Sequence, residues 1–315
     1  MFHRACCALH ADGASFMRFH EVPRGMWSQS SSKWVETGPG FWNLHVPLRM
    51  GPGGVVDIST HMSAAALPNG RFLIVDAAKM DAEQKKQFDE VTQNGELIDA
   101  VIFTHPFHTL AIPAFVAAYP ACKFFGMPRH LRIFPDIPWA GCLDKCTTRK
   151  LWEPDVVLSI PDGVQYDNPI PNSTNHFACC WVFHRASKTV HVDDSVNCWA
   201  NPGLLIRFAL GAKRGRLQFH RSLVTGAALL PEPGSAEACR TWFSSTPLTW
   251  DFDSLVTAHD SGVLGGARQQ LRELLEAPAT DAMFKRIAWN PTTTRMHNAL
   301  EVDGEDIPTE GDECG

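Results

Sequence analysis

The sequence lacks any apolar run long enough to cross a membrane. Its longest apolar stretches, Leu97–Phe103 and Leu110–Ala118, are well short of the roughly 20 residues that a spanning helix needs. The N-terminal segment also lacks the continuous apolar centre of a secretory signal, because Arg4, His10 and Asp12 interrupt it. We therefore expect no transmembrane helix and no membrane partner.

A basic patch is missing as well. The chain has 28 Lys and Arg residues against 34 Asp and Glu, a net charge of −6, and its basic residues are scattered along the sequence. This distribution gives no electrostatic footprint for a polyanion, so we expect no nucleic-acid partner. With 44% hydrophobic and 20% charged residues, the 315-residue chain has instead the composition of a globular protein.

Cysteine is too sparse to define a disulfide framework. The chain has 10 cysteines, including the adjacent pairs Cys6-Cys7 and Cys179-Cys180, and a small secreted scaffold would be denser. Cys142 and Cys146 have no second cysteine pair at zinc-finger spacing, so we expect them to be ordinary thiols. A reducing, cytoplasmic setting follows as the simplest expectation.

Three segments are predicted along the chain. Residues 1–33 carry mixed polar and small residues and end in Ser30-Ser31-Ser32, which suggests a loosely attached leader. Residues 301–315 are acidic and Gly-rich, which is typical of a flexible, solvated tail. A single domain is expected between them, over residues 34–300.

Strand-like runs alternate with helix-like runs through this domain. The predicted strands are residues 54–58, 63–67, 72–75, 98–103, 123–126, 177–183, 189–192 and 254–258. The predicted helices are residues 82–91, 112–118 and 266–277. Pro68-Asn69-Gly70 and residues 184–188 are turn signals that each predict a hairpin, and Asp81 is placed to cap the first helix. Because strands and helices occur in both halves, we expect a helix, sheet, sheet, helix sandwich.

Three of the predicted strands end in side chains that can bind metals. These side chains are His105 and His108, Asp193 and Asp194, and His259. Ligands at strand ends are held rigidly while staying open to solvent. Each group also has a structural alternative, since the histidines can hydrogen-bond in a loop and the aspartates can cap a turn. Three such ends in one mixed α/β chain can nevertheless converge on one site.

The order of these motifs resembles the metallo-β-lactamase superfamily. A strand ending in Thr104-His105 is followed by Asn175-His176 before a hairpin, then by a strand ending in Asp194 and another ending in His259. The hairpin Phe183–Thr189 is similar to that of an uncharacterised branch of the superfamily. The resemblance covers roughly residues 40–290 and implies an α/β fold, a four-layer αββα sandwich of metallo-β-lactamase type.

The first motif of that superfamily, Thr-His-x-His-x-Asp-His, is only partly kept. Aligned on Thr104-His105, the positions of the second His, the Asp and the third His hold Phe107, Thr109 and Leu110. His108 is one residue out of register with the second His. The resemblance therefore implies a site that has lost part of the family's ligand set.

The resemblance implies metal ligands at His105, His108, His176, Asp194 and His259. The first metal position would keep His105, His176 and Asp194, supplemented by His108, which is enough for one zinc or iron ion. The second position would keep Asp194 and His259 only. A mononuclear site is therefore expected.

A metal-dependent hydrolase is the function we predict from this ligand set. It would act on a small-molecule ester, thioester or lactone through a metal-bound water, with Asp194 and His259 as catalytic residues. Two alternatives stay open: a non-catalytic binding protein on the same fold, and an iron-dependent oxidoreductase, because a nitrogen and oxygen ligand set does not exclude iron. The substrate's identity and the oligomeric state are not predicted.

Overall fold

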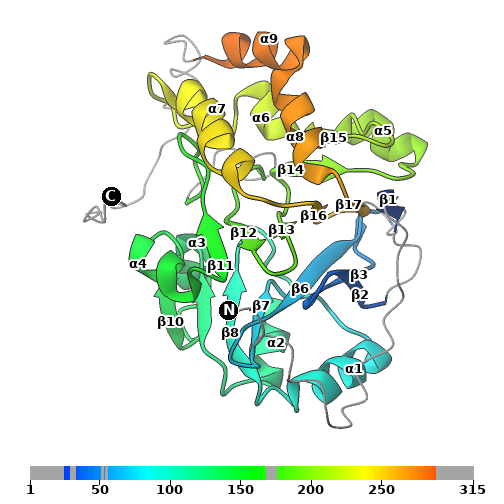
Figure 1. The fold of residues 1–315 in the computed structure, drawn as a ribbon, viewed down its shortest axis with the longest axis vertical. Helices are drawn as coiled ribbons and strands as arrows, with labels where there is room; N and C mark the ends of the chain where they lie inside the picture. Colours follow the sequence, from blue (N-terminus) through cyan, green and yellow to red (C-terminus); the bar gives the residue numbers. More distant parts are fainter. Residues whose placement is uncertain (1–24, 29–32, 51–52, 54–55, 168–175, 289–315) are drawn as a thin grey trace, which may run out of the picture.

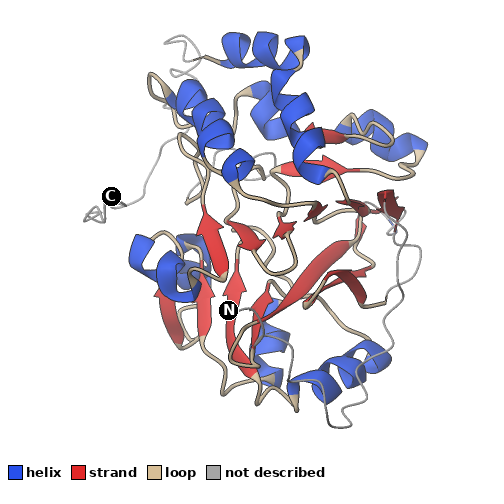
Figure 2. Cartoon of the chain, viewed as in Figure 1, coloured by secondary structure: helices blue, strands red, loops and turns tan. Residues whose placement is uncertain are grey.

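The computed structural model describes residues 25–28, 33–50, 53, 56–167 and 176–288. Two large β-sheets stand face to face at the centre, and helices cover the outer side of each sheet (Figure 1, Figure 2). The predicted α/β sandwich is thus confirmed.

The first sheet has seven strands in the order β10-β9-β8-β7-β6-β3-β2. Its strands are β2 (Val35–Gly38), β3 (Phe41–Val46), β6 (Thr60–Ala66), β7 (Phe72–Val75), β8 (Ile98–Phe103), β9 (Phe124–Gly126) and β10 (Trp139–Cys142). Neighbours from β7 to β10 are parallel, and the remaining pairs are antiparallel. Parallel strands place their carboxyl ends at one edge, where ligands usually bind.

The second sheet has six strands in the order β1-β17-β16-β13-β12-β11. Its strands are β1 (Gly25–Ser28), β11 (Val156–Ser159), β12 (Trp181–His184), β13 (Thr189–His191), β16 (Ser254–Val256) and β17 (Ser261–Leu264). Only β13 and β16 run parallel in it. Two short ribbons pair β4 (Arg49–Met50) with β5 (Val56–Asp57) and β14 (Val196–Cys198) with β15 (Leu217–Phe219).

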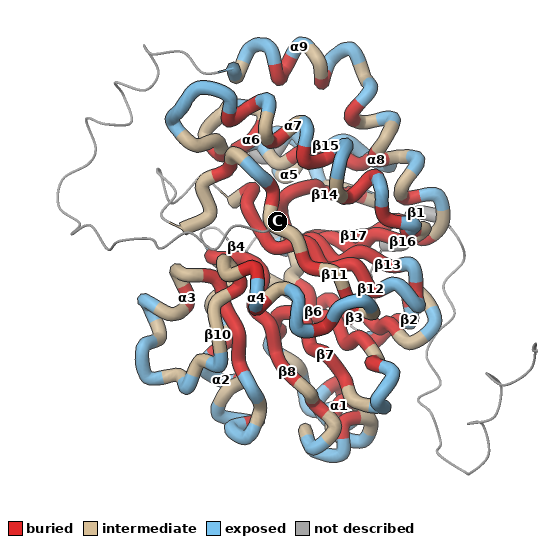
Figure 3. The backbone as a smooth tube through the Cα atoms, turned by 60° about the vertical axis from the view of Figure 1, so that its left-hand side comes forward, coloured by how far each residue is buried: buried red, intermediate tan, exposed pale blue. Residues whose placement is uncertain are grey.

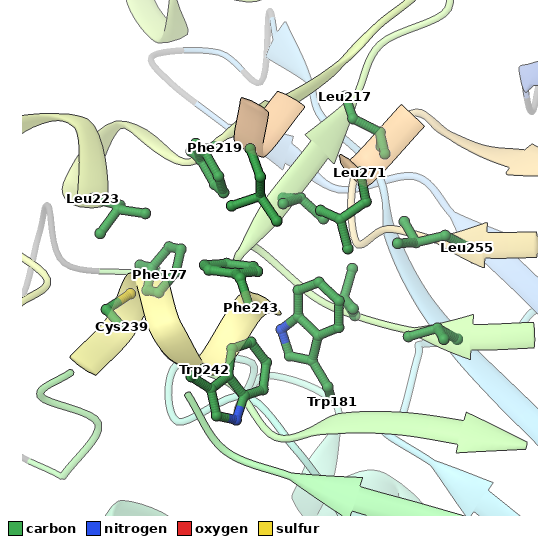
Figure 4. Close-up of a cluster of buried hydrophobic side chains, with 14 of the residues drawn as sticks. Phe177, Trp181, Leu217, Phe219, Leu223, Cys239, Trp242, Phe243, Leu255 and Leu271 are labelled. Atoms are coloured by element: carbon green, nitrogen blue, oxygen red, sulfur yellow. The ribbon is translucent and has the colours of Figure 1, made fainter. Parts of the chain in front are cut away.

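The helices divide between the two outer faces. They are α1 (Ala82–Thr92), α2 (Ile112–Ala118), α3 (Pro128–Ile133), α4 (Cys146–Arg149), α5 (Leu204–Leu210), α6 (Arg221–Thr225), α7 (Ser235–Ser245), α8 (Ala267–Glu276) and α9 (Pro278–Ile287), with short 3₁₀ turns η2 (Lys150–Trp152) and η3 (Pro247–Thr249). The first two pack on the seven-stranded sheet through Phe88 and Phe115. Helices α7 and α8 pack on the six-stranded sheet through residues such as Phe243 and Leu271 (Figure 4), and α9 joins the same core through Phe284.

Alternation along the strands produces three apolar layers. In β8, Val101 and Phe103 face the outer helices, whereas Ile102 faces the second sheet. In β12, Trp181 packs against α7 in the layer drawn in Figure 4, and Val182 faces the first sheet. Successive strand side chains point to opposite faces, so a strand covered on both faces is apolar throughout. The buried red core of Figure 3 reflects this arrangement.

Most predicted elements lie where the sequence places them. The Pro68-Asn69-Gly70 turn joins β6 and β7 as a hairpin, and Asp81 caps α1 by accepting from the backbone N–H of Gln84. The predicted strand over 54–58 is reduced to β5, and Gly54-Val55 lies outside the described residues. The strands that were not predicted are β1, β2, β3, β4, β10, β11, β14, β15 and β17, and the helices that were not predicted are α3, α4, α5, α6, α7 and α9.

The predictions for the chain ends and for the cysteines have mixed outcomes. Within the expected leader, Gly25–Ser28 forms β1 on the edge of the second sheet, while the expected tail lies outside the described residues. Cys142 is a free thiol, as predicted, but Cys146 takes part in a disulfide, so that prediction is wrong for Cys146. No helix in the described part of the chain is long and apolar enough to cross a membrane.

Candidate metal centre

The candidate site lies where strands from both sheets end. β8 continues into Thr104-His105, and the backbone N–H of Cys180 donates to the Thr104 carbonyl at 3.0 Å, which links the two sheets at this point. β13 and β16 are parallel, with His191 opposite Val256. Continuing this register by three residues brings Asp194 opposite His259, so the strand pairing itself places these two side chains together.

Asp194 is the centre of the group, because four imidazoles surround its carboxylate. The carboxylate is 3% exposed, and its oxygens lie 3.0 to 3.7 Å from a nitrogen of each ring. The contacts to Oδ2 are His105 Nε2 at 3.4 Å, His108 Nε2 at 3.6 Å and His176 Nδ1 at 3.7 Å, and the contact to Oδ1 is His259 Nε2 at 3.0 Å. Thus all five predicted site residues meet at one point.

His259 is oriented by a backbone carbonyl. Its Nδ1 lies 2.8 Å from the Ser59 carbonyl oxygen, which can only accept a hydrogen bond, so Nδ1 carries the proton. The other ring nitrogen, Nε2, faces Asp194 Oδ1 at 3.0 Å. A second-atom hydrogen bond of this kind is the usual way in which a protein fixes a histidine that binds metal through its other nitrogen.

His108 is held in a similar way by a carboxylate. Its Nδ1 lies 3.2 Å from Asp193 Oδ1 while its Nε2 faces Asp194, and its side chain is 13% exposed. Burial lowers the pKa of His108, but Asp193 and Asp194 outweigh burial and raise the pKa well above its usual value. Without a metal ion the ring is therefore an imidazolium between two carboxylates.

His105 and His176 have partners of a different kind. His105 Nε2 donates to the His176 carbonyl at 2.9 Å, and His105 Nδ1 accepts from the Phe107 backbone N–H at 3.1 Å. Burial and neighbouring His108 lower the pKa of His105 to about 3, so this ring is neutral. The His176 ring is 32% exposed and stacks on Phe107 with ring centroids 4.5 Å apart. Both side chains reach Asp194, but His105 already has two backbone partners.

An orphaned carboxylate oxygen marks where a cation fits. Among the described residues, Asp194 Oδ1 is buried without a hydrogen bond of acceptable geometry, although His259 Nε2 lies 3.0 Å from it. Buried polar atoms in native structures are nearly always satisfied, so such atoms call for a specific explanation. Ligands at about 2.0 to 2.1 Å from a tetrahedral zinc ion lie about 3.3 to 3.4 Å from one another. The contacts around Asp194 scatter about that spacing, so these residues fit a metal ion.

A second, wholly buried polar network lies beneath this group. Asp193 accepts from His61 Nε2 at 3.1 Å and from the Thr104 hydroxyl at 2.6 Å. The same hydroxyl is 2.6 Å from Asp76, which also accepts from His191 Nε2 at 3.0 Å. A hydroxyl has one proton, so one of the two Thr104 contacts needs a proton from a carboxyl group. Burial and the charge of Asp193 raise the pKa of Asp76, which can hold that proton.

The two networks differ in how completely they are satisfied. His61, His191 and Asp193 have ligand-type atoms within 4.8 Å of one another, as do two groups that share Asp194. In the buried network, however, His61 Nδ1 also has Asn43 as a partner at 3.2 Å and His191 Nδ1 has Ser63 at 2.9 Å. Each of these ring nitrogens therefore has a partner within the protein, whereas Asp194 Oδ1 has no well-aligned donor among the described residues.

The sequence patterns did not single out the members of this buried network as a site. Asp193 and His191 stand close to Asp194 in the sequence, but His61 lies near the start of β6, 132 residues from its partner Asp193. A histidine within a strand gives no signal of its own. At the degenerate motif, Leu110 is 83% exposed, so the position of the missing third His does not line the site.

Comparisons with known proteins give similarity in structure only. No family model matches the sequence, and no curated protein matches it. Solved metallo-β-lactamases align with it at low identity. The structure from Erythrobacter litoralis is 13% identical, with 80% of this chain and 96% of that one covered and a TM-score of 0.47. The structure from Hirschia baltica is 14% identical, with 80% and 97% of the two chains covered and a TM-score of 0.49, and the structure from Pontibacter korlensis is 10% identical, with 78% and 98% covered and a TM-score of 0.48. The sheets and outer helices of this chain themselves form the four-layer αββα fold that the resemblance predicts.

Proposed function

We propose that the chain is a metal-dependent hydrolase of a small-molecule ester, thioester or lactone, with one zinc or iron ion held by Asp194, His108 and His259. The observation that carries the proposal is the pair Asp194 Oδ1 and His259 Nε2. Asp194 Oδ1 is buried without a hydrogen bond of acceptable geometry, although His259 Nε2 lies 3.0 Å from it. Buried polar atoms are nearly always satisfied, and a cation bound by both atoms would satisfy this oxygen.

The two histidines among these ligands are each oriented by a contact to the ring nitrogen that faces away from Asp194. His259 is fixed by the Ser59 carbonyl and His108 by Asp193, so each presents its Nε2 towards Asp194. An ion bound there would act as a Lewis acid and lower the pKa of a coordinated water. Asp194 lies just beyond the end of β13, where Nε2 of His108 and Nε2 of His259 both face its carboxylate. Its own pKa is raised by burial, but the nearby His259 and His108 outweigh this and keep it well below the usual range.

His176 is suited to work on the solvent side of the site. Its ring is the most exposed of the four imidazoles, and its Nδ1 is 3.7 Å from Asp194. From this position it can complete the ligand set or carry a proton between the site and solvent. His105 is suited to support it, because its Nε2 holds the His176 backbone carbonyl. The proposal therefore assigns one ion, although His105, His176 and Asp194 could form a second group.

Metal analysis combined with hydrolysis assays tests the proposal. Protein purified without a His-tag is expected to hold about one zinc or iron ion per chain and to hydrolyse at least one of a set of nitrophenyl esters, thioesters and lactones. Asp194→Asn should lose both the ion and the activity. Asp251→Asn is the matched control, because Asp251 is 74% exposed and pairs with Lys188 on the surface.

The other outcomes separate the alternatives. Protein with no bound ion and no hydrolysis, even after metal is added, would support a non-catalytic binding protein. Coloured protein containing iron, with redox activity and no hydrolysis, would support an iron-dependent oxidoreductase.

A further inference from the structure

Helix α5 presents large apolar side chains to solvent. Leu204 is 70% exposed, Leu205 62% and Phe208 88%. Residues spaced three and four apart lie on one face of a helix, so Phe208 adjoins both leucines. Half of the exposed large hydrophobic side chains of the described residues are in this one short helix. Single exposed apolar residues are ordinary, but a cluster of this kind points to a binding surface.

Basic residues accompany this apolar helix. Arg207, Lys213, Arg214 and Arg216 are all exposed. The sequence has no Asp or Glu from Ser195 to Pro231, although acidic residues outnumber basic ones by 34 to 28 over the whole chain. The scattered basic residues noted in the sequence thus include one stretch in which no carboxylate offsets them.

Hydrogen bonds at its base close residues 199–216 into one loop, which contains these residues and which we call the basic-apolar loop. At its base Trp199 and Arg214 form a β-bridge, Gly215 N–H donates to the Trp199 carbonyl at 2.8 Å, and Arg214 Nε donates to the Ala200 carbonyl at 3.0 Å. The cations at 213–216 are therefore fixed next to the start of the segment that carries α5. In Figure 1, α5 projects from the side of the molecule beside β15.

The base of the loop also touches the candidate metal centre. The Trp199 ring stacks near His259, with centroids 6.2 Å apart, and Asp260 accepts from the Ala200 backbone N–H at 2.7 Å. A surface that engages the loop would consequently lie close to the site.

We propose that the basic-apolar loop docks the protein reversibly on an anionic lipid membrane surface. Leu204, Leu205 and Phe208 would enter the boundary between headgroups and acyl chains, while the cations pair with lipid phosphates. The expectation of no membrane partner rested on the lack of an apolar run long enough to span a bilayer. A segment that lies in the membrane interface does not need that length. This inference does not depend on the proposed function.

Charge favours this occupant over two others. A second copy seated on the same surface would bring the cations of one subunit against those of the other, because a two-fold interface pairs a surface with itself. A nucleic acid would neutralise the cations but would leave Leu204 and Leu205 without apolar contacts. An anionic membrane satisfies both features together.

Co-sedimentation with vesicles tests the proposal on the full chain. The protein should bind phosphatidylcholine vesicles that contain phosphatidylglycerol, should bind pure phosphatidylcholine much more weakly, and should be released by salt. The double variant Leu205→Ser with Phe208→Ser should weaken binding by about tenfold or more. Lys213→Gln and Arg216→Gln should weaken it roughly fivefold each.

Leu151→Ser is the matched control, because Leu151 is 58% exposed outside the loop and should leave binding unchanged. Circular dichroism of each variant checks that the fold is kept. Failure of the wild-type chain to bind anionic vesicles would overturn the proposal, as would equal binding to both kinds of vesicle. Dimers that the Leu205 and Phe208 changes disperse, without vesicle binding, would assign the surface to a second copy instead. Hydrolysis of a water-soluble ester should be unaffected by these variants, which separates this inference from the proposed function.

Discussion

The adjacent aspartates Asp193 and Asp194 belong to two clusters that differ in how their polar atoms are satisfied. Asp193 is wholly buried, and both of its oxygens accept hydrogen bonds, from His61 and from Thr104. Asp194 is surrounded by four imidazoles, yet its Oδ1 has no well-aligned donor among the described residues. Both clusters gather imidazoles around an aspartate, and they differ in how well the oxygens of that aspartate are satisfied.

This difference indicates that the two clusters have different roles. The satisfied cluster joins β6, β8 and β13 across the sandwich and can hold the strand ends in place. The other cluster leaves Asp194 Oδ1 buried without a well-aligned donor among the described residues, with His259 Nε2 3.0 Å away. A polar network with all its partners rigidifies a structure, whereas a set of ligands needs atoms that the protein itself does not satisfy.

The largest effect is expected for Asp194→Asn. Because all candidate ligands face this carboxylate, bound metal should fall to below about a tenth of an ion per chain and hydrolysis by roughly a hundredfold or more. Elemental analysis and initial rates measure both. Retention of a full equivalent of metal would show that Asp194 is not the central ligand.

The Asp193→Asn variant is expected to lose some metal affinity and some stability. The change weakens the support of His108 Nδ1, so metal affinity should fall about 10- to 100-fold without being abolished. It also replaces one of the two buried oxygens that accept from His61 and Thr104 with an amide donor, so the metal-free chain should lose more stability than Asp194→Asn does. Competition with a zinc chelator and urea unfolding give the two values. If Asp193→Asn affected only metal binding, the division between the clusters would fail.

The pH dependence of stability should report on His191. Burial lowers the pKa of His191, but Asp193 and Asp76 outweigh burial and raise the pKa to about 9. The folded state therefore binds the proton more tightly than the unfolded state, so the stabilisation is complete below about pH 6.5 and is lost as pH rises through about 9. The free energy of unfolding should drop by about 3 kcal/mol at most across this window.

His191→Gln should flatten that alkaline slope in the metal-free chain, as measured by urea unfolding at several pH values. His184→Gln serves as its control, because burial lowers the pKa of His184 and this ring contributes no alkaline loss. An unchanged slope in His191→Gln would show that the buried cluster does not hold a proton at His191.

The smallest effect is expected for Thr104→Val, which keeps the shape of the side chain but removes its hydroxyl. Asp76 Oδ2 and Asp193 Oδ2 each lose a contact of 2.6 Å, and the unfolding free energy should fall by about 2 kcal/mol. Metal content should stay near that of the wild type. A matching loss of metal would place Thr104 among the groups that support the ligands directly.

The sequence predicts the fold and the members of the site better than it predicts their roles. His105, Asp194 and His259 follow apolar strands, and the parallel pairing of β13 and β16 brings two of them together. That His105 is engaged by two backbone groups, however, depends on the path of residues 176 and 107, which no local pattern encodes. His61 could not be assigned because its partner comes from the opposite sheet.

The position of a bound ion tests the central claim most directly. A crystal of untagged protein grown with zinc, with anomalous data collected at the zinc absorption edge, should show a peak about 2.0 to 2.1 Å from an oxygen of Asp194 and from Nε2 of both His108 and His259. The absence of a peak at Asp194, or a peak between His61 and His191 in its place, would contradict the assignment.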